Sequence, residues 1–183
     1  MSDIDMLSTQ LFEEAKRFLE KALEESEAAA AREAYAHAAL LLAFSSLESH
    51  INAVADELTL RPNLHVLDRS ILTEKEFALE KGRFIIKDRL KIYRFEDRLS
   101  YILANFSSSD PFASGKPSWW PALSAGFNLR NKLVHPKENI QLTAAAVSAA
   151  MQAIFECLNA LFTAIYNRPF PSFKRGLQSS LNF

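Results

Sequence analysis

The stretch "LLLAFSSLESHINAVADEL", residues 40–58, carries a regular helical pattern of apolar residues. Its large apolar residues recur at steps of four and three, at Leu40, Phe44, Leu47, Ile51, Val54 and Leu58. Such steps place side chains on one face of an α-helix. The periodicity therefore predicts a long helix over about 28–58 with one buried face.

The same rhythm returns near the C-terminus, at Val147, Met151, Ile154, Leu158, Leu161 and Ile165. It predicts a second core helix over about 143–166. A third helix is expected over about 6–27, with Leu11, Ala15, Phe18 and Ala22 on its apolar face. Only four glycines occur, and we expect no strand, because no segment alternates convincingly. The fold class is predicted to be all-α.

Turn residues divide the middle of the chain. "RPN" (61–63) ends the long helix, and Thr73 followed by Glu76 has the form of a capping box that would open a short helix through Lys81. Further helices are expected over about 95–106 and in "WWPALSAGFNLRNKLVH" (119–135). We predict an up-and-down four-helix bundle with additional short helices as a single domain over 1–168, followed by an irregular tail over 169–183.

Composition fits one soluble domain, with 183 residues of which 49% are apolar and 23% charged. The single Cys157 excludes an intramolecular disulfide and is typical of a reducing compartment. The acidic N-terminus lacks the basic and apolar regions of a signal peptide. The most apolar run, 144–166, carries a polar stripe, which argues against a membrane span. We expect a cytoplasmic protein that does not contact membranes.

Charge is nearly balanced overall but unevenly distributed. The net charge of −1 argues against a nucleic-acid binder that depends on a global positive field. Residues 1–33 hold nine acidic and four basic residues, whereas residues 81–98 hold seven basic and three acidic ones. The basic segment would either face phosphates or form a solvated helix face.

The motif with the strongest chemical content is "FNLRNKLVHP", residues 127–136. On a helix, Asn131 and His135 share a face, whereas Arg130 and His135 lie about 140° apart. A proline disfavours helical backbone angles in the residue before it. Because Pro136 follows His135, we expect His135 at or just past the last turn of the helix. A His there also complements the helix dipole, which is the purely structural alternative.

Spacing alone does not single out this motif. Arg followed after four residues by His is expected about 0.24 times by chance, and Arg32 and His37 repeat it inside an Ala-rich helix. Requiring Asn directly after the Arg lowers the expectation to about 0.01, and only "RNKLVH" meets it. The four glycines lack the spacing of a nucleotide-binding loop, and Glu48 and His50 lack the spacing of a metal-ligand pair on a helix. The sequence also shows no convincing context for a serine or cysteine nucleophile, and we predict no cofactor.

"LRNKLVHP" resembles the signature of the HEPN superfamily, small all-α proteins that carry Arg, four to six residues and then His, often with a polar residue directly after the Arg. "AFSSLESHINAVADE" (43–57) is similar to an early HEPN core helix. "LDRSILTEKEFALEKGRF" followed by "FEDRLSYIL" resembles the intervening segment of prokaryotic members. The likeness covers roughly residues 30–166.

The resemblance implies metal-independent RNA cleavage by a homodimer in which the two motifs meet across the interface. Arg130 and His135 would then be catalytic with Asn131, and Glu48 and Lys132 would support them. A neutral His can accept the proton of a ribose 2′-hydroxyl, and Arg can stabilise the phosphate in the transition state. Such a protein would be a toxin with a cognate antitoxin, or a defence effector. The alternative is a non-catalytic HEPN-like module that binds a nucleotide, RNA or a protein.

Two further sets of residues have two interpretations each. Glu48 belongs to a polar stripe on the second helix, which would be either a solvated face or, as the family suggests, a face that holds Arg130 or His135. Trp119 and Trp120 would stack on bases or belong to the core. No role is assigned to His37, His50 or His65.

Overall fold

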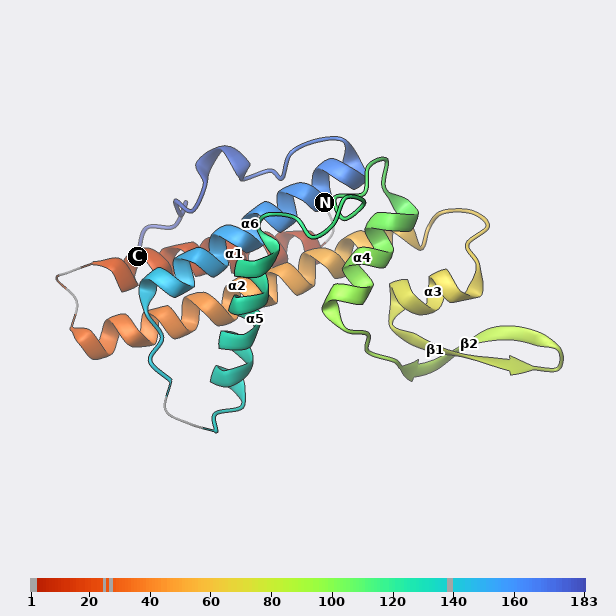
Figure 1. Cartoon of the computed structure of the whole chain (residues 1–183), viewed down its shortest axis with the longest axis horizontal. Coiled ribbons are helices and arrows are strands. Elements are labelled where there is room, and N and C mark those ends of the chain that lie inside the picture. The colour runs from red at the N-terminus through yellow and green to blue at the C-terminus, as the bar shows by residue number, and fades with distance from the viewer. Residues whose placement is uncertain (1–2, 25, 27, 138–139) are drawn as a thin grey trace.

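The computed structural model describes residues 3–24, 26, 28–137 and 140–183. These residues form mainly helices, with one small antiparallel sheet: α1 (Asp3–Leu23), α2 (Ala29–Leu58), α3 (Val66–Thr73), β1 (Lys75–Glu80), β2 (Arg83–Leu90), α4 (Phe95–Phe106), α5 (Trp120–Val134), α6 (Ala144–Tyr166) and the 3₁₀ turn η1 (Phe173–Arg175). The long helices α1, α2 and α6 lie side by side, while α3 and the two strands extend from one end (Figure 1). The mainly helical prediction is confirmed.

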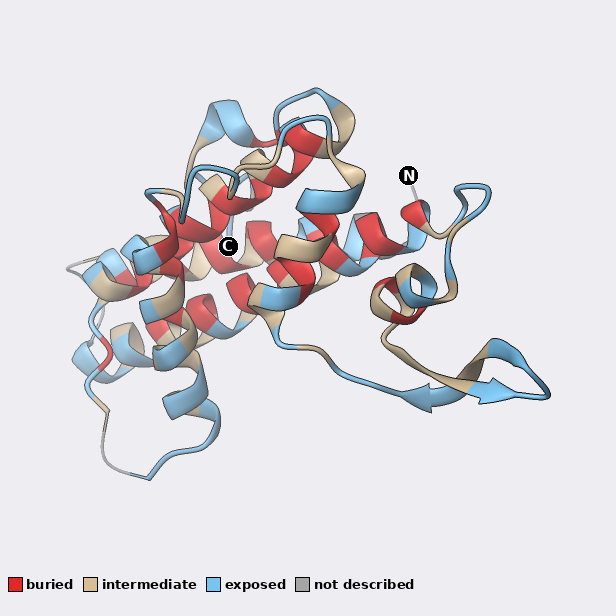
Figure 2. Ribbon diagram, turned by 45° about the vertical axis from the view of Figure 1, so that its right-hand side comes forward, coloured by how far each residue is buried: buried red, intermediate tan, exposed pale blue. Residues whose placement is uncertain are grey.

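The core lies where the apolar periodicities predicted it. All six seam residues of α2 are buried, as are Val147, Met151, Ile154, Leu158 and Leu161 of α6. On α1 the predicted Ala15 and Ala22 are buried, whereas Leu11 and Phe18 are only half-buried. Their neighbours Phe12 and Leu19 occupy the core instead. Figure 2 shows the buried positions concentrated where the long helices face one another. Trp119 and Trp120 are buried beside Phe112, which supports their core interpretation.

The predicted helix over 73–81 is wrong. Thr73 is the last residue of α3, and Glu74 follows with a left-handed φ of 50°. The chain then forms a β-hairpin whose turn residues Lys81 and Gly82 both have positive φ, of 49° and 77°. Two consecutive positive φ values match the twist of a two-residue hairpin turn. The expectation that no segment forms a strand is therefore also wrong.

Two helices resemble membrane spans by length and composition alone. They are α2 and α6, whose most apolar windows have mean hydropathies of 1.3 and 1.4. However, 61% and 56% of those windows are buried inside the protein. Core helices of a soluble protein have this character, so the structure is compatible with a soluble chain.

The close approach of α5 to α6 depends on Gly126. A Cβ atom built on Gly126 would lie 2.7 Å from Cβ of Ala150 and 3.1 Å from Cζ of Phe44. The small side chains of Gly126 and Ala150 thus allow the two helices to approach closely at this crossing.

Gly126→Ala is expected to lower the free energy of unfolding by about 1–3 kcal/mol, because the added methyl group overpacks this crossing. Urea unfolding measures the change. The double variant Gly126→Ala/Ala150→Gly should recover part of the loss, since it removes the closest atom. A Gly126→Ala protein as stable as the wild type would show that the helices do not meet this closely.

The C-terminal segment packs against α1 through Glu13. The Glu13 carboxylate accepts hydrogen bonds from Lys16 Nζ at 3.0 Å and from the Ser180 backbone N and Oγ at 2.6 and 2.7 Å. Arg175 Nη2 donates to it at 3.0 Å. Phe170 is buried in the core. The segment over 169–183 thus contributes to the packed structure, although η1 is the one helical turn among its residues.

Burial raises the pKa of Glu13, but the hydrogen bonds from Ser180 and Lys16 outweigh it, so the pKa falls below its ordinary 4.5. A carboxylate with a lowered folded-state pKa contributes stability above its unfolded pKa and loses it as the pH falls through the folded pKa. Glu13→Gln is therefore expected to cost roughly 1–3 kcal/mol of unfolding free energy at pH 7 and much less at pH 3.

Urea unfolding at the two pH values checks this expectation, with Glu14→Gln, the half-exposed neighbour, as the control. A Glu13→Gln deficit of the same size at pH 3 and pH 7 would contradict it, because the deficit would then not depend on the ionised carboxylate.

Candidate active site

The motif lies at the C-terminal end of α5, as its sequence predicted. His135 is the residue that ends the helix, with φ −125° and ψ 67°, and its backbone N donates to the Asn131 carbonyl at 2.9 Å. Pro136 follows and prevents a further turn. The His135 side chain is exposed and makes no hydrogen bond within the described part of the chain. It is therefore accessible to a ligand.

Arg130 joins α5 to α2. Its Nη2 donates to Oε1 of Glu48 in a close ion pair, and its Nη1 donates to Oδ1 of Asn131 at 3.1 Å. Both side chains of the ion pair are partly exposed, at 27% for Arg130 and 44% for Glu48, so water screens their attraction. The pair orients the guanidinium without burying it. Of the two interpretations of Glu48, the geometry matches the one in which it holds Arg130.

Two cavities meet at Asn131. The first, of about 770 Å³, is lined by His135 and Lys132 together with Asn128, Asn131, Lys137 and Ile140. The second, of about 570 Å³, contains Arg130, Asn131 and Glu48 beside Asn52 and Arg98. Within one chain, Arg130 and His135 thus lie in neighbouring cavities that share Asn131 as a wall. The structure brings Arg130, Asn131 and Glu48 into contact and leaves His135 and Lys132 on the other side of Asn131.

Aromatic side chains support the second cavity. The Phe127 ring packs against Phe44 of α2 and Phe95 of α4, with centroid distances of 4.5 and 4.6 Å. Trp120, which is buried, also borders this cavity. Because these rings are fixed by core packing, the α5 backbone that carries Arg130 is held against α2 and α4.

The same cavity contains a second arginine, Arg98, which is buried and which the sequence motif did not reveal. Arg98 of α4 is 8% exposed and donates to Asn52 Oδ1 at 2.6 Å, to Glu74 Oε2 at 3.0 Å and to the Leu72 carbonyl at 2.7 Å. Burial lowers its pKa, while the nearby carboxylates of Glu74 and Asp56 raise it. An arginine remains charged through such shifts. Arg98 therefore places a permanent positive charge behind the Arg130 site.

A signal for this cluster was present in the polar stripe of α2. Two members of that stripe accept hydrogen bonds from arginines, Glu48 from Arg130 and Asn52 from Arg98. The stripe is therefore solvated and also paired: Ser45, Asn52 and Asp56 are exposed, while Glu48 and Asn52 accept from charged guanidinium groups of two other helices.

The other titratable candidates lie elsewhere. Burial raises the pKa of the Cys157 thiol well above its usual range, so it is held as an unreactive thiol. His65 caps α3 together with Asp68, and His37 lies 3.9 Å from Glu33. Among residues 3–24, 26, 28–137 and 140–183, no group of three His, Cys, Asp or Glu side chains is arranged to hold a metal ion.

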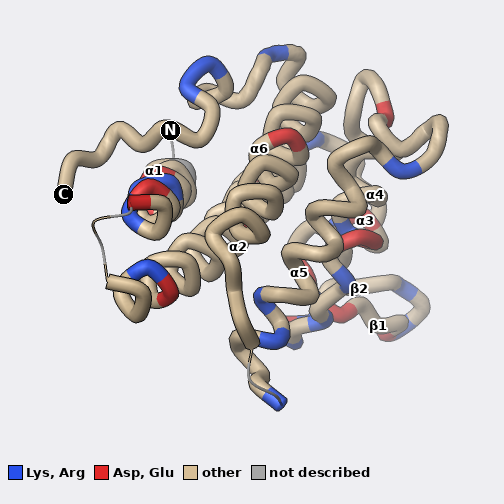
Figure 3. Tube along the Cα trace, turned by 60° about the vertical axis from the view of Figure 1, so that its left-hand side comes forward, with Lys and Arg blue, Asp and Glu red and all other residues tan. Residues whose placement is uncertain are grey.

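The Lys and Arg positions at the end of α5 and those of the hairpin lie towards the same side of the molecule in the chain trace of Figure 3. Comparisons with models of protein families, with curated proteins and with solved structures found no match.

Proposed function

We propose that this protein is a metal-independent endoribonuclease of HEPN type that acts as a homodimer. The observation that carries the proposal is the cluster at the end of α5, where Asn131 separates the exposed His135 from an Arg130 that Glu48 orients. RNA cleavage without a metal needs a group that takes the 2′-hydroxyl proton and returns one to the 5′-oxygen, and a cation at the phosphate; His135 and Arg130 have these properties. As the finer fold, we propose a four-helix bundle of α1, α2, α5 and α6, in which α5 runs across the other three helices (Figure 1).

The chemistry follows from the ordinary properties of these side chains. The ribose 2′-oxygen attacks the adjacent phosphorus while its proton passes to the neutral imidazole of His135. The bond from phosphorus to the 5′-oxygen breaks, and that oxygen takes the proton from the imidazolium that the same His135 has become. Arg130 stabilises the negative charge on the phosphate oxygens, and Asn131 and Lys132 add donors beside it. The products are a 2′,3′-cyclic phosphate and a 5′-hydroxyl.

A dimer would unite the two halves of the site. In one chain Arg130 and His135 line different cavities, in agreement with their angular separation of about 140° on a helix. A two-fold axis beside Asn131 would bring the Arg130 cavity of one chain towards His135 of the other. Light scattering tests the assembly, and a mass of one chain at micromolar concentration would contradict it.

The biological setting is part of the same proposal. A cytoplasmic toxin with a cognate antitoxin, or a defence effector, would use such an activity against cellular or phage RNA. Growth arrest on expression of the wild type, relieved by a protein encoded beside it, would support this setting. Normal growth at an expression level that yields active nuclease would oppose it.

The second candidate is a non-catalytic HEPN-like module that binds a nucleotide, RNA or a protein. Two observations favour it: Arg130 is already paired with Glu48, and the net charge of the chain is −1. In that case Arg130 and His135 would hold a phosphate without cleaving it.

One experiment separates the two functions. The purified protein is incubated in EDTA with a single-stranded RNA, with DNA of the same sequence, and with the RNA carrying one 2′-deoxy nucleotide at the main cleavage position. The proposal predicts cleavage of the RNA alone, with 2′,3′-cyclic phosphate ends and loss of the cut at the 2′-deoxy position. Binding of the RNA without cleavage would favour the non-catalytic module, and cleavage of the DNA would contradict the proposed chemistry.

A further inference from the structure

The hairpin β1–β2 has no role in the RNA cleavage chemistry proposed above. It projects from the helical body and packs against α3 (Figure 1). Most of it is exposed, including Leu79 at 64% and Phe84 at 56% (Figure 2). A two-stranded ribbon of this kind is only marginally stable alone, so α3 and the hairpin root must hold it in place. An exposed arm that the fold holds in place has the character of a binding element.

The hairpin root is fixed beside the candidate active site. The Lys91 backbone N donates to the Glu74 carbonyl at 2.7 Å, and the Tyr93 backbone N donates to the Glu74 carboxylate at 3.4 Å. Glu74 in turn accepts from the buried Arg98. Ile92, Tyr93 and Arg94 then line the cavity that contains Arg130. The chain thus runs without interruption from the hairpin into the wall of the site.

The hairpin and its root are basic. Residues 75–94 hold seven Lys or Arg and three Asp or Glu, against a net charge of −1 for the whole chain. Four of the basic residues are engaged: Lys75, Lys87 and Arg89 pair with Asp88, Glu80 and Glu76, and Lys91 lies over the Phe77 and Tyr93 rings. Lys81, Arg83 and Arg94 form no ion pair with the residues that the structure describes. Glu80, which lies opposite Arg83 in the strand register, pairs with Lys87 instead. Unpaired cations gathered on one arm favour an anionic partner.

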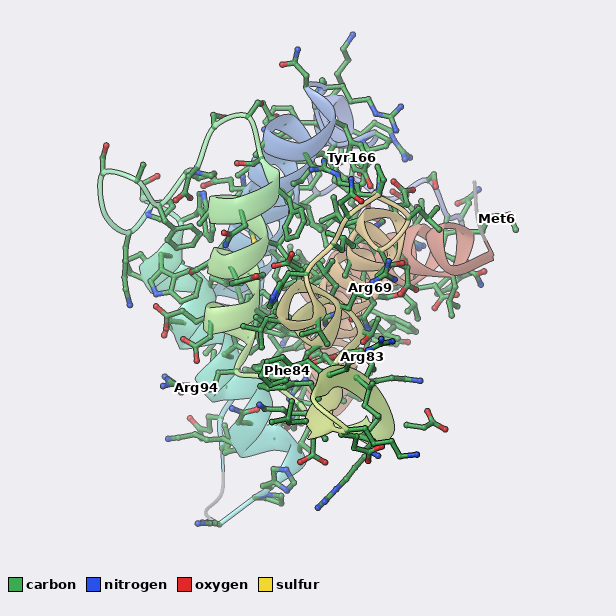
Figure 4. All side chains as sticks on the ribbon, turned by 90° about the vertical axis from the view of Figure 1, so that its right-hand side faces the viewer. Met6, Arg69, Arg83, Phe84, Arg94 and Tyr166 are labelled. Carbon is green, nitrogen blue, oxygen red and sulfur yellow. The ribbon has the colours of Figure 1, made fainter. Side chains whose placement is uncertain are left out.

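The tip of the hairpin carries one exposed aromatic residue, Phe84, and two exposed basic residues, Lys81 and Arg83. Leu79 pairs with Phe84 across the strands and Glu80 with Arg83, so Phe84 and Arg83 point to opposite faces of the ribbon. Figure 4 shows Arg83 and Phe84 on the hairpin and Arg94 beside α5, all at the same end of the molecule. An exposed aromatic ring on one face and cations on the turn and the other face suit a single-stranded nucleic acid, which offers bases for stacking and phosphates for charge.

We propose that this hairpin is an RNA-binding arm that holds single-stranded RNA and leads it past Arg94 to Arg130. The inference rests on the proposed ribonuclease function, because that function supplies the reason for RNA to enter the neighbouring cavity. Lys81 and Arg83 contact phosphates at the tip, Phe84 stacks on a base, and Arg94 bridges the tip and the cavity. The basic residues of the arm attract RNA locally, although the chain as a whole is nearly neutral.

The test measures binding separately from cleavage. The wild-type chain is titrated against a fluorescent 2′-O-methyl oligoribonucleotide, which has no free 2′-hydroxyl and cannot be cleaved. Lys81→Glu/Arg83→Glu is expected to raise the Kd at least about 10-fold near physiological salt. Loss of two phosphate contacts should also reduce the slope of log K against log[salt] by about 1.4. Phe84→Ala should raise the Kd with little change in that slope, because stacking releases no counterions.

The matched control is Arg168→Glu/Lys174→Glu, which changes the charge equally on exposed residues beside the C-terminal tail. That tail runs along the side of the molecule away from the hairpin (Figure 1). The control double variant should bind as the wild type does.

Equal Kd values for the two double variants, or no binding by the wild type, would contradict the proposal that the hairpin binds RNA. Cleavage of ordinary RNA by the same proteins reports on the ribonuclease independently, so an active enzyme with a dispensable hairpin would leave the proposed function standing. Light scattering on Phe84→Ala and Lys81→Glu/Arg83→Glu tests the alternative that the hairpin forms an interface between two copies of the chain. A fall from dimer to monomer would assign the hairpin to the interface between copies and overturn RNA binding.

Discussion

Replacement of His135 by alanine is expected to lower the rate of RNA cleavage by about 10²–10⁴-fold, because it removes the group that takes the 2′-hydroxyl proton. Arg130→Ala should lower the rate by about 10²–10³-fold through loss of charge stabilisation at the phosphate. His135 is exposed and Arg130 is partly exposed, so neither change should lower the stability of the fold. Single-turnover cleavage in EDTA, with urea unfolding alongside, measures both quantities.

The chain provides its own control for this prediction. Arg32 and His37 have the same spacing on α2 but lie far along the helix from Glu48. Arg32→Ala and His37→Ala are expected to cleave RNA at the wild-type rate. If all four variants cleave alike, the activity comes from a different site or from a contaminating nuclease, and the proposed roles of Arg130 and His135 are wrong.

The largest effect on stability is expected at Arg98. Arg98→Met removes three hydrogen bonds and leaves Asn52 and Glu74 facing an apolar side chain. Loss of one member of a buried pair typically costs 3–5 kcal/mol, and because Glu74 is 24% exposed we expect about 2–4 kcal/mol here. Urea unfolding measures the loss.

Arg94→Met is the control for that experiment, because Arg94 is exposed and precedes the same helix. Its effect should lie within about 0.5 kcal/mol of zero. Equal stability of Arg98→Met and Arg94→Met would show that the cluster does not hold the hairpin root to α2 and α4.

The long helices could be predicted because their burial has the period of the helix itself. Leu40 to Leu58 face one core, and no distant residue is needed to recognise the pattern. The hairpin could not be predicted in this way. The Thr73/Glu76 pair satisfies the capping-box pattern, and "RFIIKDRL" places two Ile side by side instead of alternating. Its turn is Lys81–Gly82, which lacks the Asn or Asp of the commonest hairpin turns.

The site was predictable to the extent that it is local. Arg130, Asn131 and His135 stand within six residues, and Pro136 fixes where the helix ends. The partners of these residues are distant in sequence. Glu48 is 82 residues from Arg130, and Arg98 is 46 residues from Asn52 and 24 from Glu74. A paired stripe and a solvated stripe contain the same residue types, so only the packing of α5 and α4 on α2 distinguishes them.

The most direct test of a ribonuclease site built by two chains is the activity of a mixed dimer. Chains carrying Arg130→Ala and His135→Ala are co-expressed with different tags, and the heterodimer is purified through both tags. One of its two sites then combines the intact Arg130 of one chain with the intact His135 of the other, so we expect RNA cleavage in EDTA at about half the wild-type rate. A heterodimer as inactive as either homodimeric variant, beside an active wild type, would contradict it.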